Sequence, residues 1–409
     1  MLSMTLARSL PLLLLAAAAC GTAEARDAAR PADALPAWSA PVPITSLFGA
    51  TRGRDPRIAA LAVDAGGRPH ALVADDADGD GVADVLLHAW MQGADWSAAE
   101  RLDVSPGLSD GARLVADGAG GVHAVWYEHT RPGTPPRSAD ALLHRVWRGG
   151  AWGAPSVVRA AADSLDMPLT HLDAALDARG RLHLVHETAA GLAESVWAHG
   201  RWGEAVPTGR DGATPALAPG AGVMAYVAGW AEAHGGRGSS DVLVRARRAD
   251  GTWDEPVPVH VDPREYSHLP QLATAGDGTL HAVWLETRGG EVTPRRLMHA
   301  RAADGRRWSP AVEITPPQTE GQILYSPRLS VDGRGRVLLV FTRFGDGGVG
   351  RPTHWQMRLG AEGWSPAERL FAALGESDSE IETARGADGV LWAVFKSGDG
   401  VYYAARARP

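Results

Sequence analysis

The sequence has little cysteine, phenylalanine and tyrosine, no cluster of basic residues, and no long apolar run beyond its first twenty residues. Cys20 is the only cysteine among 409 residues, so no disulfide can form within the chain, and stability must come from burial and from closure of the fold. The net charge of -8 argues against nucleic acid or an anionic membrane surface as the partner. The 49 glycines and 28 prolines are typical of a turn-rich, soluble all-β protein.

Residues 267–315 contain one copy of a unit that recurs along the whole chain. The unit has four short apolar segments separated by turns, with the second segment at 280–284 and a tryptophan, Trp308, before the fourth. Four such segments form one small antiparallel sheet. A sheet of this size cannot bury both faces alone, so it must stack on copies of itself, as the sheets of a β-propeller do.

The tryptophan before the fourth segment counts the units. It recurs 50 to 56 residues apart, as Trp96, Trp152, Trp202, Trp253, Trp308 and Trp364. The chain ends after the third segment of one more unit, and the missing fourth segment lies at the other end of the chain, after Trp38. The sequence therefore predicts an all-β, seven-bladed propeller closed by its N-terminal strand, with no open sheet edge. The expected blades are residues 55–103, 111–159, 170–209, 213–260, 267–315, 325–371, and 377–409 together with 36–46.

Residues 1–19 combine a positive residue, Arg8, with an apolar core and small residues before Cys20. This segment resembles a bacterial lipoprotein signal peptide, which implies export, lipidation at Cys20 and a membrane association through the lipid alone. Gly21 favours the outer membrane by the same resemblance, on its periplasmic or cell-surface side. Residues 20–35 are expected to form a flexible tether to a monomeric propeller. The alternative is an ordinary signal peptide that ends by chance in a cysteine.

Histidine occupies one position of the second segment in four units, as His70, His123, His183 and His281. These side chains are either a ring of ligands or buried groups whose ring nitrogens bond to the backbone in the seams between blades. Repetition at one structural position favours the second interpretation.

In a propeller, the starts of the first strands and the ends of the second strands meet at one mouth of the central channel. The first set is Arg57, Arg113, His171, His268, Tyr325, Arg328 and Glu382, and the second is Asp75, Glu128, Glu187, Glu286, Arg343 and Lys396. These charges do not repeat from unit to unit, which favours a binding site over a structural role, the alternative being a solvated rim. Tyr127, His129, Trp230 and His234 lie in or beside the long loops of this mouth, and rings beside charged groups suit a sugar ligand.

Residues 76–84 have carboxylates at the first, third, fifth and ninth places and glycine at the sixth. This spacing predicts a structural Ca²⁺ site in which the ligands are Asp76, Asp78, Asp80, the carbonyl of Val82, and Asp84. The twelfth place is Leu87 rather than glutamate, so the loop is not an EF-hand. The alternative is an acidic, solvated turn.

The unit resembles the BNR, or Asp-box, repeat of the sialidase-like propellers, in which Asp precedes Trp before the fourth strand, as Asp304 precedes Trp308 here. Arg57-Ile58-Ala59-Ala60-Leu61 is similar to the R-I-P-x-L segment whose arginine binds the substrate carboxylate. Tyr266-Ser267-His268-Leu269, followed by Glu286, is similar to the segment that carries the nucleophilic tyrosine. The sequence departs from the family in having Ala59 for proline, seven blades for six, and only candidates, Arg328 and Arg343, for the other two arginines of the triad.

A second enzyme interpretation follows from the blade number, because some uronate polysaccharide lyases are seven-bladed propellers. Such a reaction needs a cation for the uronate and a His or Tyr as base and acid. The candidates for these roles are Tyr127, His129, His144 and Arg145, or Tyr266, His268 and Arg288. The sequence as a whole favours a propeller that binds a glycan or another polar surface ligand. The alternatives are a carbohydrate-active enzyme of either type and a protein-interaction scaffold.

Overall fold

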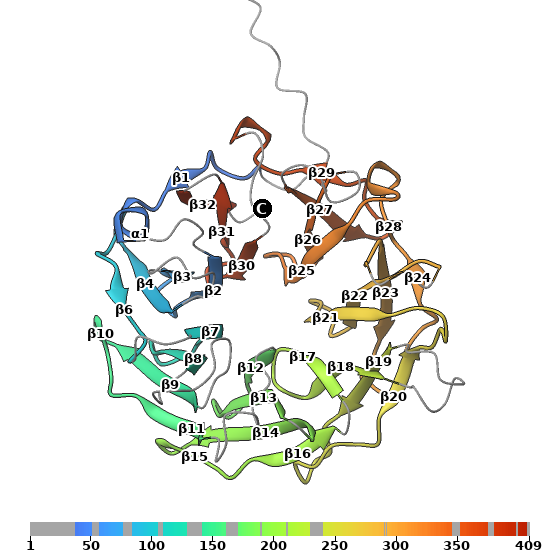
Figure 1. Cartoon of the computed structure of the whole chain (residues 1–409), viewed down its shortest axis with the longest axis horizontal. Coiled ribbons are helices and arrows are strands. Elements are labelled where there is room, and N and C mark those ends of the chain that lie inside the picture. The colour runs from blue at the N-terminus through green and yellow to red at the C-terminus, as the bar shows by residue number, and fades with distance from the viewer. Residues whose placement is uncertain are drawn as a thin grey trace, which may run out of the picture. The chain divides into compact units, whose positions relative to one another are not determined.

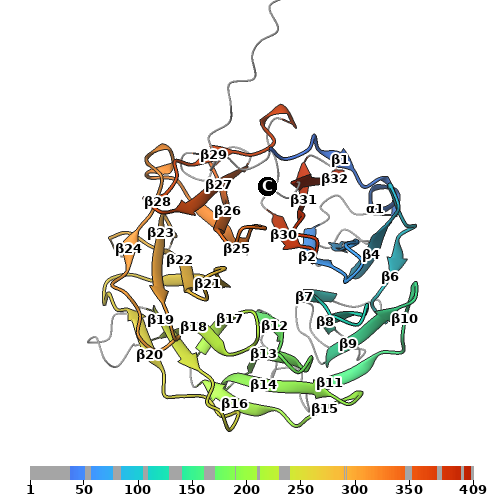
Figure 2. The ribbon, with the colours of Figure 1, turned by 180° about the vertical axis from the view of Figure 1, so that it is seen from behind.

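The protein is described by a computed structural model that covers residues 37–50, 57–76, 84–104, 109–128, 141–160, 171–188, 190–209, 212–229, 240–289, 291, 293–345, 352–374, 380–397 and 400–406. Seven small antiparallel sheets stand around one axis, which confirms the predicted seven-bladed propeller (Figure 1). From both sides of the ring the first strand of each blade is innermost (Figures 1 and 2). The proposed signal peptide, Cys20 and the tether lie outside the described residues. In the described part of the chain no helix is long and apolar enough to cross a membrane.

The first three blades each contain five strand segments. Blade 1 is β2 (Arg57–Val63), β3 (Pro69–Asp75), β4 (Val85–Gln92), β5 (Asp95–Trp96) and β6 (Glu100–Arg101); blade 2 is β7 (Ser109–Ala116), β8 (Val122–Glu128), β9 (Ala141–Arg148), β10 (Ala151–Trp152) and β11 (Ser156–Ala160); blade 3 is β12 (Leu172–Leu176), β13 (Leu182–Thr188), β14 (Gly191–Ala198), β15 (Arg201–Trp202) and β16 (Val206–Gly209).

The other four blades follow the same plan. Blade 4 is β17 (Gly212–Leu217), β18 (Val223–Gly229), β19 (Ser240–Ala246) and β20 (Val257–His260); blade 5 is β21 (Ser267–Thr274), β22 (Leu280–Glu286), β23 (Arg296–Ala302) and β24 (Val312–Glu313); blade 6 is β25 (Leu324–Val331), β26 (Val337–Arg343), β27 (Thr353–Gly360), β28 (Gly363–Trp364) and β29 (Glu368–Arg369); blade 7 is β30 (Ile381–Arg385), β31 (Leu391–Ser397), β32 (Gly400–Arg406) and β1 (Val42–Pro43). The short helices are α1 (Thr45–Ala50), η2 (Pro317–Thr319) and η4 (Ala372–Leu374).

The fourth strand is split into two pieces in blades 1, 2, 3 and 6, and both pieces pair with the third strand. In blade 2, Trp152 pairs with Trp147 and Ser156 pairs with His144, and Pro155 lies between the two pieces. Proline has no N–H to give to the ladder, so it interrupts pairing without ending the blade.

The N-terminal strand closes the ring as the sequence predicted. Val42 pairs with Tyr403 and Pro43 pairs with Tyr402. The N-terminal strand β1 is therefore the outer strand of blade 7, next to the C-terminal strand β32. Ile44 and Leu47, which follow β1, are fully buried in the apolar core shared by blades 7 and 1. Closure therefore combines backbone pairing with burial of apolar side chains.

Candidate functional site

A polar cavity of about 260 Å³ lies on the axis, at the mouth where the first strands begin. All seven first strands contribute to it. Its lining includes Arg57, Arg113, His171, Thr214, Leu269, Gln271, Tyr325, Ser326, Arg328, Glu380 and Glu382. Six of the seven residues predicted at the starts of the first strands therefore line one cavity, whereas His268 does not belong to the lining.

Backbone bulges shape the wall of this cavity. Thr214, Leu269 and Ser326 all have positive φ, of 47°, 46° and 46°, and Gly111 at the corresponding place in blade 2 has φ 64°. At each of these places the pairing of the first strand with the second shifts its register. Residues with side chains cost free energy in this conformation, and such strain gathers at functional sites. Three strained residues around one cavity therefore make it a candidate functional site.

The bulge at Thr214 supplies a direct test of this strain. Thr214 is β-branched, and its hydroxyl is buried without a hydrogen-bond partner in the described part of the chain. Thr214→Gly is expected to raise the free energy of unfolding by about 0.5–1 kcal/mol, because relief of the left-handed strain exceeds the entropy cost of glycine. Chemical denaturation measures the change. Thr383→Gly is the matched control, since Thr383 also has a buried, unpartnered hydroxyl but no positive φ; it should lower the stability, and a loss in both variants would contradict the strain.

Four charged residues form one layer at the floor of the cavity, here called the charged layer: Arg113, Asp173, Arg328 and Glu382. Their second-strand partners are Val125, Val185, Val340 and Val394, which occupy the same position in four blades. Arg328 Nε and Nη2 donate to Glu382 Oε1 at 2.8 and 2.6 Å. Arg113 Nε lies 3.4 Å from Asp173 Oδ1. Each pair joins the first strands of two neighbouring blades, so the charged layer connects blades to one another near the axis.

Burial and pairing act in opposite directions on the ionisation of this layer. Burial lowers the pKa of Arg328, but Glu382 and the more distant Asp173 raise it, and the net shift is upward. Burial raises the pKa of Asp173 despite Arg113 and the N–H of Leu217, which donates to Asp173 Oδ2 at 2.7 Å. Arg113 and Arg328 are thus already neutralised by carboxylates of the protein.

Arg57 differs from the other two arginines of the cavity. Within the described residues its guanidinium has no ion pair and no hydrogen bond, and its side chain is half-buried. Tyr325 lies on the same cavity with 44% of its surface exposed, and it packs edge-on against Phe344 at 6.3 Å between ring centres. The cavity therefore offers one guanidinium without a carboxylate partner among the described residues and one partly exposed tyrosine ring.

His171 completes the polar wall of the cavity. Its Nδ1 lies 3.4 Å from Oε1 of Glu187, close enough for an ion pair but not for a well-aligned hydrogen bond. The same Glu187 oxygen accepts a hydrogen bond from the N–H of Thr214 at 2.6 Å. Glu187 is nearly buried, so it connects His171 to the strained bulge of the next blade without reaching the cavity itself.

The prediction that the ends of the second strands line the same cavity differs from the structure. Asp75, Glu128, Glu187, Glu286 and Lys396 are all buried, and together with Arg343 they are absent from its lining. Their side chains hold neighbouring segments in place. Glu128 accepts hydrogen bonds from the N–H of Val104 at 2.9 Å and from Trp126 Nε1 at 2.6 Å.

Glu286 has a similar structural environment, because it lies 3.2 Å from His260 Nε2 and 2.6 Å from Arg296 Nη2. Alternation along the strand explains the error. The residue at a strand end can point into the seam as readily as toward the axis, and an isolated carboxylate in a seam is stabilised by cations and N–H groups.

The remaining predicted site residues are scattered. Tyr127 is buried in the core between blades 2 and 3, and burial raises the pKa of its hydroxyl. His268 is half-buried, and burial lowers its pKa. Arg288 pairs with Glu313 at 2.7 Å on the surface, and Arg343 lies 5.0 Å from the ring centre of Trp355.

Tyr266 precedes the cavity-lining part of β21 and is half-buried, with its N–H bonded to the hydroxyl of Thr287 at 2.8 Å. The structure therefore does not unite Tyr266, Glu286 and Arg288 at the cavity. Nor does it place Tyr127, His144 or Arg145 there.

Several predicted residues fall outside the described part of the chain. They are Asp78, Asp80 and Val82 of the proposed Ca²⁺ loop, and His129, Trp230 and His234 of the long loops. Asp76 and Asp84 are described, and the N–H of Asp84 donates to the carbonyl of Asp75 at 3.0 Å. Among the described residues, no group of three or more His, Cys, Asp or Glu is arranged to hold a metal. The Ca²⁺ site stays a prediction.

The repeated histidines lie in the seams between blades, but their partners are side chains rather than backbone. His70 contacts His88 at 3.0 Å, His123 contacts His144 at 2.9 Å, and His281 contacts His299 at 3.0 Å, in each case from Nδ1 to Nε2. Trp152 of the next blade donates to His88 Nδ1 at 3.0 Å. These histidines therefore do not form a ring of ligands around the axis. They form pairs, each between the second and the third strand of one blade.

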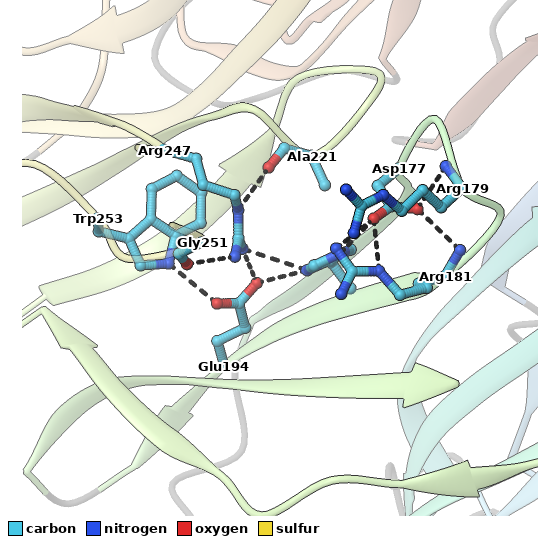
Figure 3. Close-up of polar contacts among 9 residues, drawn as sticks. Asp177, Arg179, Arg181, Glu194, Ala221, Arg247, Gly251 and Trp253 are labelled. Atoms are coloured by element: carbon cyan, nitrogen blue, oxygen red, sulfur yellow. Dashed lines mark hydrogen bonds and ion pairs between the residues drawn. The ribbon is translucent and has the colours of Figure 1, made fainter. Parts of the chain in front are cut away.

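Blade 3 replaces the second histidine of the pair with Glu194 (Figure 3). His183 Nδ1 lies 2.7 Å from Glu194 Oε1, and Arg247 of blade 4 forms an ion pair with the same carboxylate. Trp253 Nε1 donates to Glu194 Oε2 at 3.0 Å. Burial raises the pKa of Glu194, but His183, Arg247 and Trp253 lower it further than burial raises it. This seam is held by charges where the other three are held by neutral imidazoles.

No known protein-family profile matches the chain, and no curated protein is similar to it in sequence. Similarity is found among solved structures. An ulvan lyase, a polysaccharide lyase solved with bound -[GlcA(1-4)Rha3S]-, is 12% identical, with 90% of this chain and 94% of that chain covered and a TM-score of 0.54.

An alpha-L-arabinanase of Penicillium chrysogenum, solved with arabinobiose, is also 12% identical, over 91% of this chain and 99% of that chain, with a TM-score of 0.52. The hydrazine synthase of Kuenenia stuttgartiensis is 9% identical, over 85% of this chain and 94% of that chain, with a TM-score of 0.53. At these identities the likeness shows the propeller fold alone. Carbohydrate-active enzymes are among the structural neighbours, and so is an enzyme with no carbohydrate in its name, which is why function must be argued from the site.

Proposed function

We propose that the protein is an exported, lipid-anchored, sialidase-like propeller that binds an anionic saccharide at the axial cavity. The observation that carries the proposal is Arg57, a half-buried guanidinium in a polar cavity with no carboxylate partner in the described part of the chain. A guanidinium in such a place binds a carboxylate or sulfate through two parallel hydrogen bonds. This role matches the arginine of the R-I-P-x-L segment that residues 57–61 resemble.

The rest of the cavity suits the body of a sugar. The exposed part of the Tyr325 ring can pack on the apolar face of a pyranose. Gln271, His171 and Glu380 line the cavity and carry donors and acceptors for hydroxyl groups. The structural neighbours that bind arabinobiose and a glucuronate-containing ligand support a saccharide over other polar ligands.

A glycan array with uronate-terminated, sulfated and neutral glycans, followed by calorimetry on the best binder, tests the proposal. Arg57→Ala is expected to weaken binding of an anionic glycan about 10- to 150-fold, the equivalent of about 1.5–3 kcal/mol for a hydrogen bond to a charged group. Arg57→Lys should lie between, because lysine keeps the charge without the bidentate geometry.

Arg201→Ala is the matched control. Arg201 is exposed on β15 and does not line the cavity, so its loss removes the same charge from the protein without touching the site. Equal binding by wild type and Arg57→Ala, or a preference for neutral glycans, would overturn the proposal.

A carbohydrate-active enzyme is the second candidate, favoured by the pair of His171 and Glu187. A histidine that lines a cavity, with a buried carboxylate 3.4 Å from its Nδ1, is a candidate general base. If the protein cleaves the glycan it binds, His171→Ala should abolish product formation while binding persists. Binding without turnover in the wild type would leave the protein as a lectin-like binder.

A further inference from the structure

We propose that the opposite mouth of the channel is a second binding site, for a small amphipathic monoanion with an apolar body and one carboxylate. A pocket of about 420 Å³ lies there. It is lined by the far ends of three consecutive first strands, β21, β25 and β30, and by Pro219. This inference is independent of the saccharide site, because the two cavities share no lining residue.

The charged layer separates the two cavities. The lining of the axial cavity reaches Gln271, Arg328 and Glu382, and the lining of the second pocket begins with the residues that follow them, Leu272, Leu329 and Thr383. The ion pair between Arg328 and Glu382 lies at this boundary. A ligand at one mouth therefore does not reach the other.

A close contact between two hairpins shapes the rim of this pocket. The N–H of Gly276 in blade 5 donates to the carbonyl of Gly335 in blade 6 at 2.8 Å. A Cβ on Gly276 would lie 2.8 Å from the Cα of Gly335, and a Cβ on Gly335 would lie 2.5 Å from the Cα of Gly276. Both positions require glycine, since no side chain fits between the two backbones. The rim is thus built from specific residues of two blades and is not a chance gap.

The chemistry of the lining changes from floor to rim. The apolar part consists of Leu272, Leu329 and Val331, together with Pro219 and small residues. The hydroxyls of Ser330 and Thr383 are buried and have no hydrogen-bond partner within the described residues. Because both hydroxyls are covered by protein atoms, they offer a ligand no hydrogen bond, and the pocket can hold a ligand only through its apolar lining and its charge.

Arg385 supplies the charge that selects the ligand. It lines the pocket, is exposed, and within the described residues has no ion pair or side-chain hydrogen bond. In a chain with a net charge of -8, an uncompensated cation above an apolar pocket favours an anion whose body is apolar. Neutral saccharides fit less well, because the apolar lining offers their hydroxyl groups too few partners.

Sodium octanoate, titrated into the whole protein by calorimetry or observed by ligand NMR, is the probe. Saturable binding is expected, and Arg385→Ala should weaken it at least about tenfold, as loss of a charged hydrogen bond does. Octan-1-ol is the matched neutral ligand, and its binding should be the same in wild type and in Arg385→Ala. Arg334→Ala is the matched control protein, since Arg334 is exposed on the neighbouring hairpin without lining the pocket.

Each outcome decides the matter. No saturable octanoate binding, or equal affinity in wild type and Arg385→Ala, would overturn the site. An equal loss of octanoate affinity in Arg334→Ala would show that the binding depends on general surface charge and not on this pocket. Arg57→Ala should leave octanoate binding unchanged and Arg385→Ala should leave glycan binding unchanged, so failure at one mouth is distinguishable from failure at the other.

Discussion

Acidification from pH 7 to pH 5 is expected to destabilise the propeller by several kcal/mol, enough to unfold much of it without denaturant. The cause is a set of buried histidines that the fold holds neutral. Burial lowers the pKa of His70, His299 and His186 to about 4. Burial lowers the pKa of His144 and His354 to about 3. The pKa of His88, His123 and His281 is lowered in the same direction and for the same main reason.

The pairs in the seams explain why protonation is costly. Trp152 donates to His88 Nδ1, so the proton of His88 is on Nε2 and is donated to His70 Nδ1. A second proton on either ring would have no acceptor within the pair, and protonation of both rings would bring two positive charges together. The carboxylate of Asp64, 3.5 Å from His70 Nε2, offsets this only in part, as the lowered pKa of His70 records.

The sign follows from linkage. A histidine whose folded pKa lies below its unfolded value of about 6.5 contributes its full stability above pH 6.5 and loses it as the pH falls toward the folded pKa. The fall in the pKa of His70 from 6.5 to about 4 corresponds to about 3 kcal/mol at most. Several such groups together match the whole stability of a typical domain, about 5–15 kcal/mol. His260 acts in the opposite sense, because the hydrogen bond that it donates to the carboxylate of Glu286 raises its pKa.

Urea unfolding at half-unit steps between pH 7.5 and 4.5 measures the effect. The fall in the free energy of unfolding should steepen below pH 6.5, with an uptake of several protons on unfolding. His354→Gln should remove close to one proton from that slope, since His354 is buried with Thr342 as its hydrogen-bond partner. His199→Gln is the control, because His199 is exposed in a turn and should leave the slope unchanged. A stability that is flat between pH 7 and 5 would contradict the neutral seams.

Deletion of residues 37–44 is expected to abolish cooperative folding of the ring. The deletion removes β1, exposes the edge of β32, and takes Ile44 out of the core between blades 7 and 1. An exposed strand edge is a template for aggregation. The closure also holds blade 6, because Trp38 Nε1 and Arg406 Nη2 both donate to Gln356 Oε1, at 3.1 and 2.7 Å.

Single substitutions divide this effect into its parts. Ile44→Ser should cost about 2–4 kcal/mol, as the loss of a large buried aliphatic side chain does, since Ile44 is 0% exposed. Val42→Ser removes the same kind of side chain from the same segment, but Val42 is 42% exposed and its loss should cost little. The melting temperatures of the two variants and the aggregation of the deletion protein are the measurements. A deletion protein that melts cooperatively at the wild-type temperature would show that the ring does not depend on this strand.

Much of the fold could be predicted because its determinants are local and repeated. The tryptophan before each fourth strand counted the blades, and the incomplete last unit together with the segment after Trp38 predicted the closure. Repetition assigns these histidines to structure, and His70 does contact Trp147 of the next blade. Their partners were missed because His88 and His299 are on the third strand, where the repeat is less regular.

The blade number, the closure and the residues that begin each first strand could be predicted from the sequence, because period and turn chemistry act over a few residues. Tertiary structure alone decided which charges meet. Arg328 and Glu382 are 54 residues apart in sequence, and only the stacking of blades 6 and 7 brings them together as an ion pair. Glu286 forms an ion pair with Arg296, its strand partner within blade 5, and Arg57 stays in the cavity without a carboxylate among the described residues. The charge pattern along the chain does not say where each charged side chain points. That direction is set when each blade packs on the next.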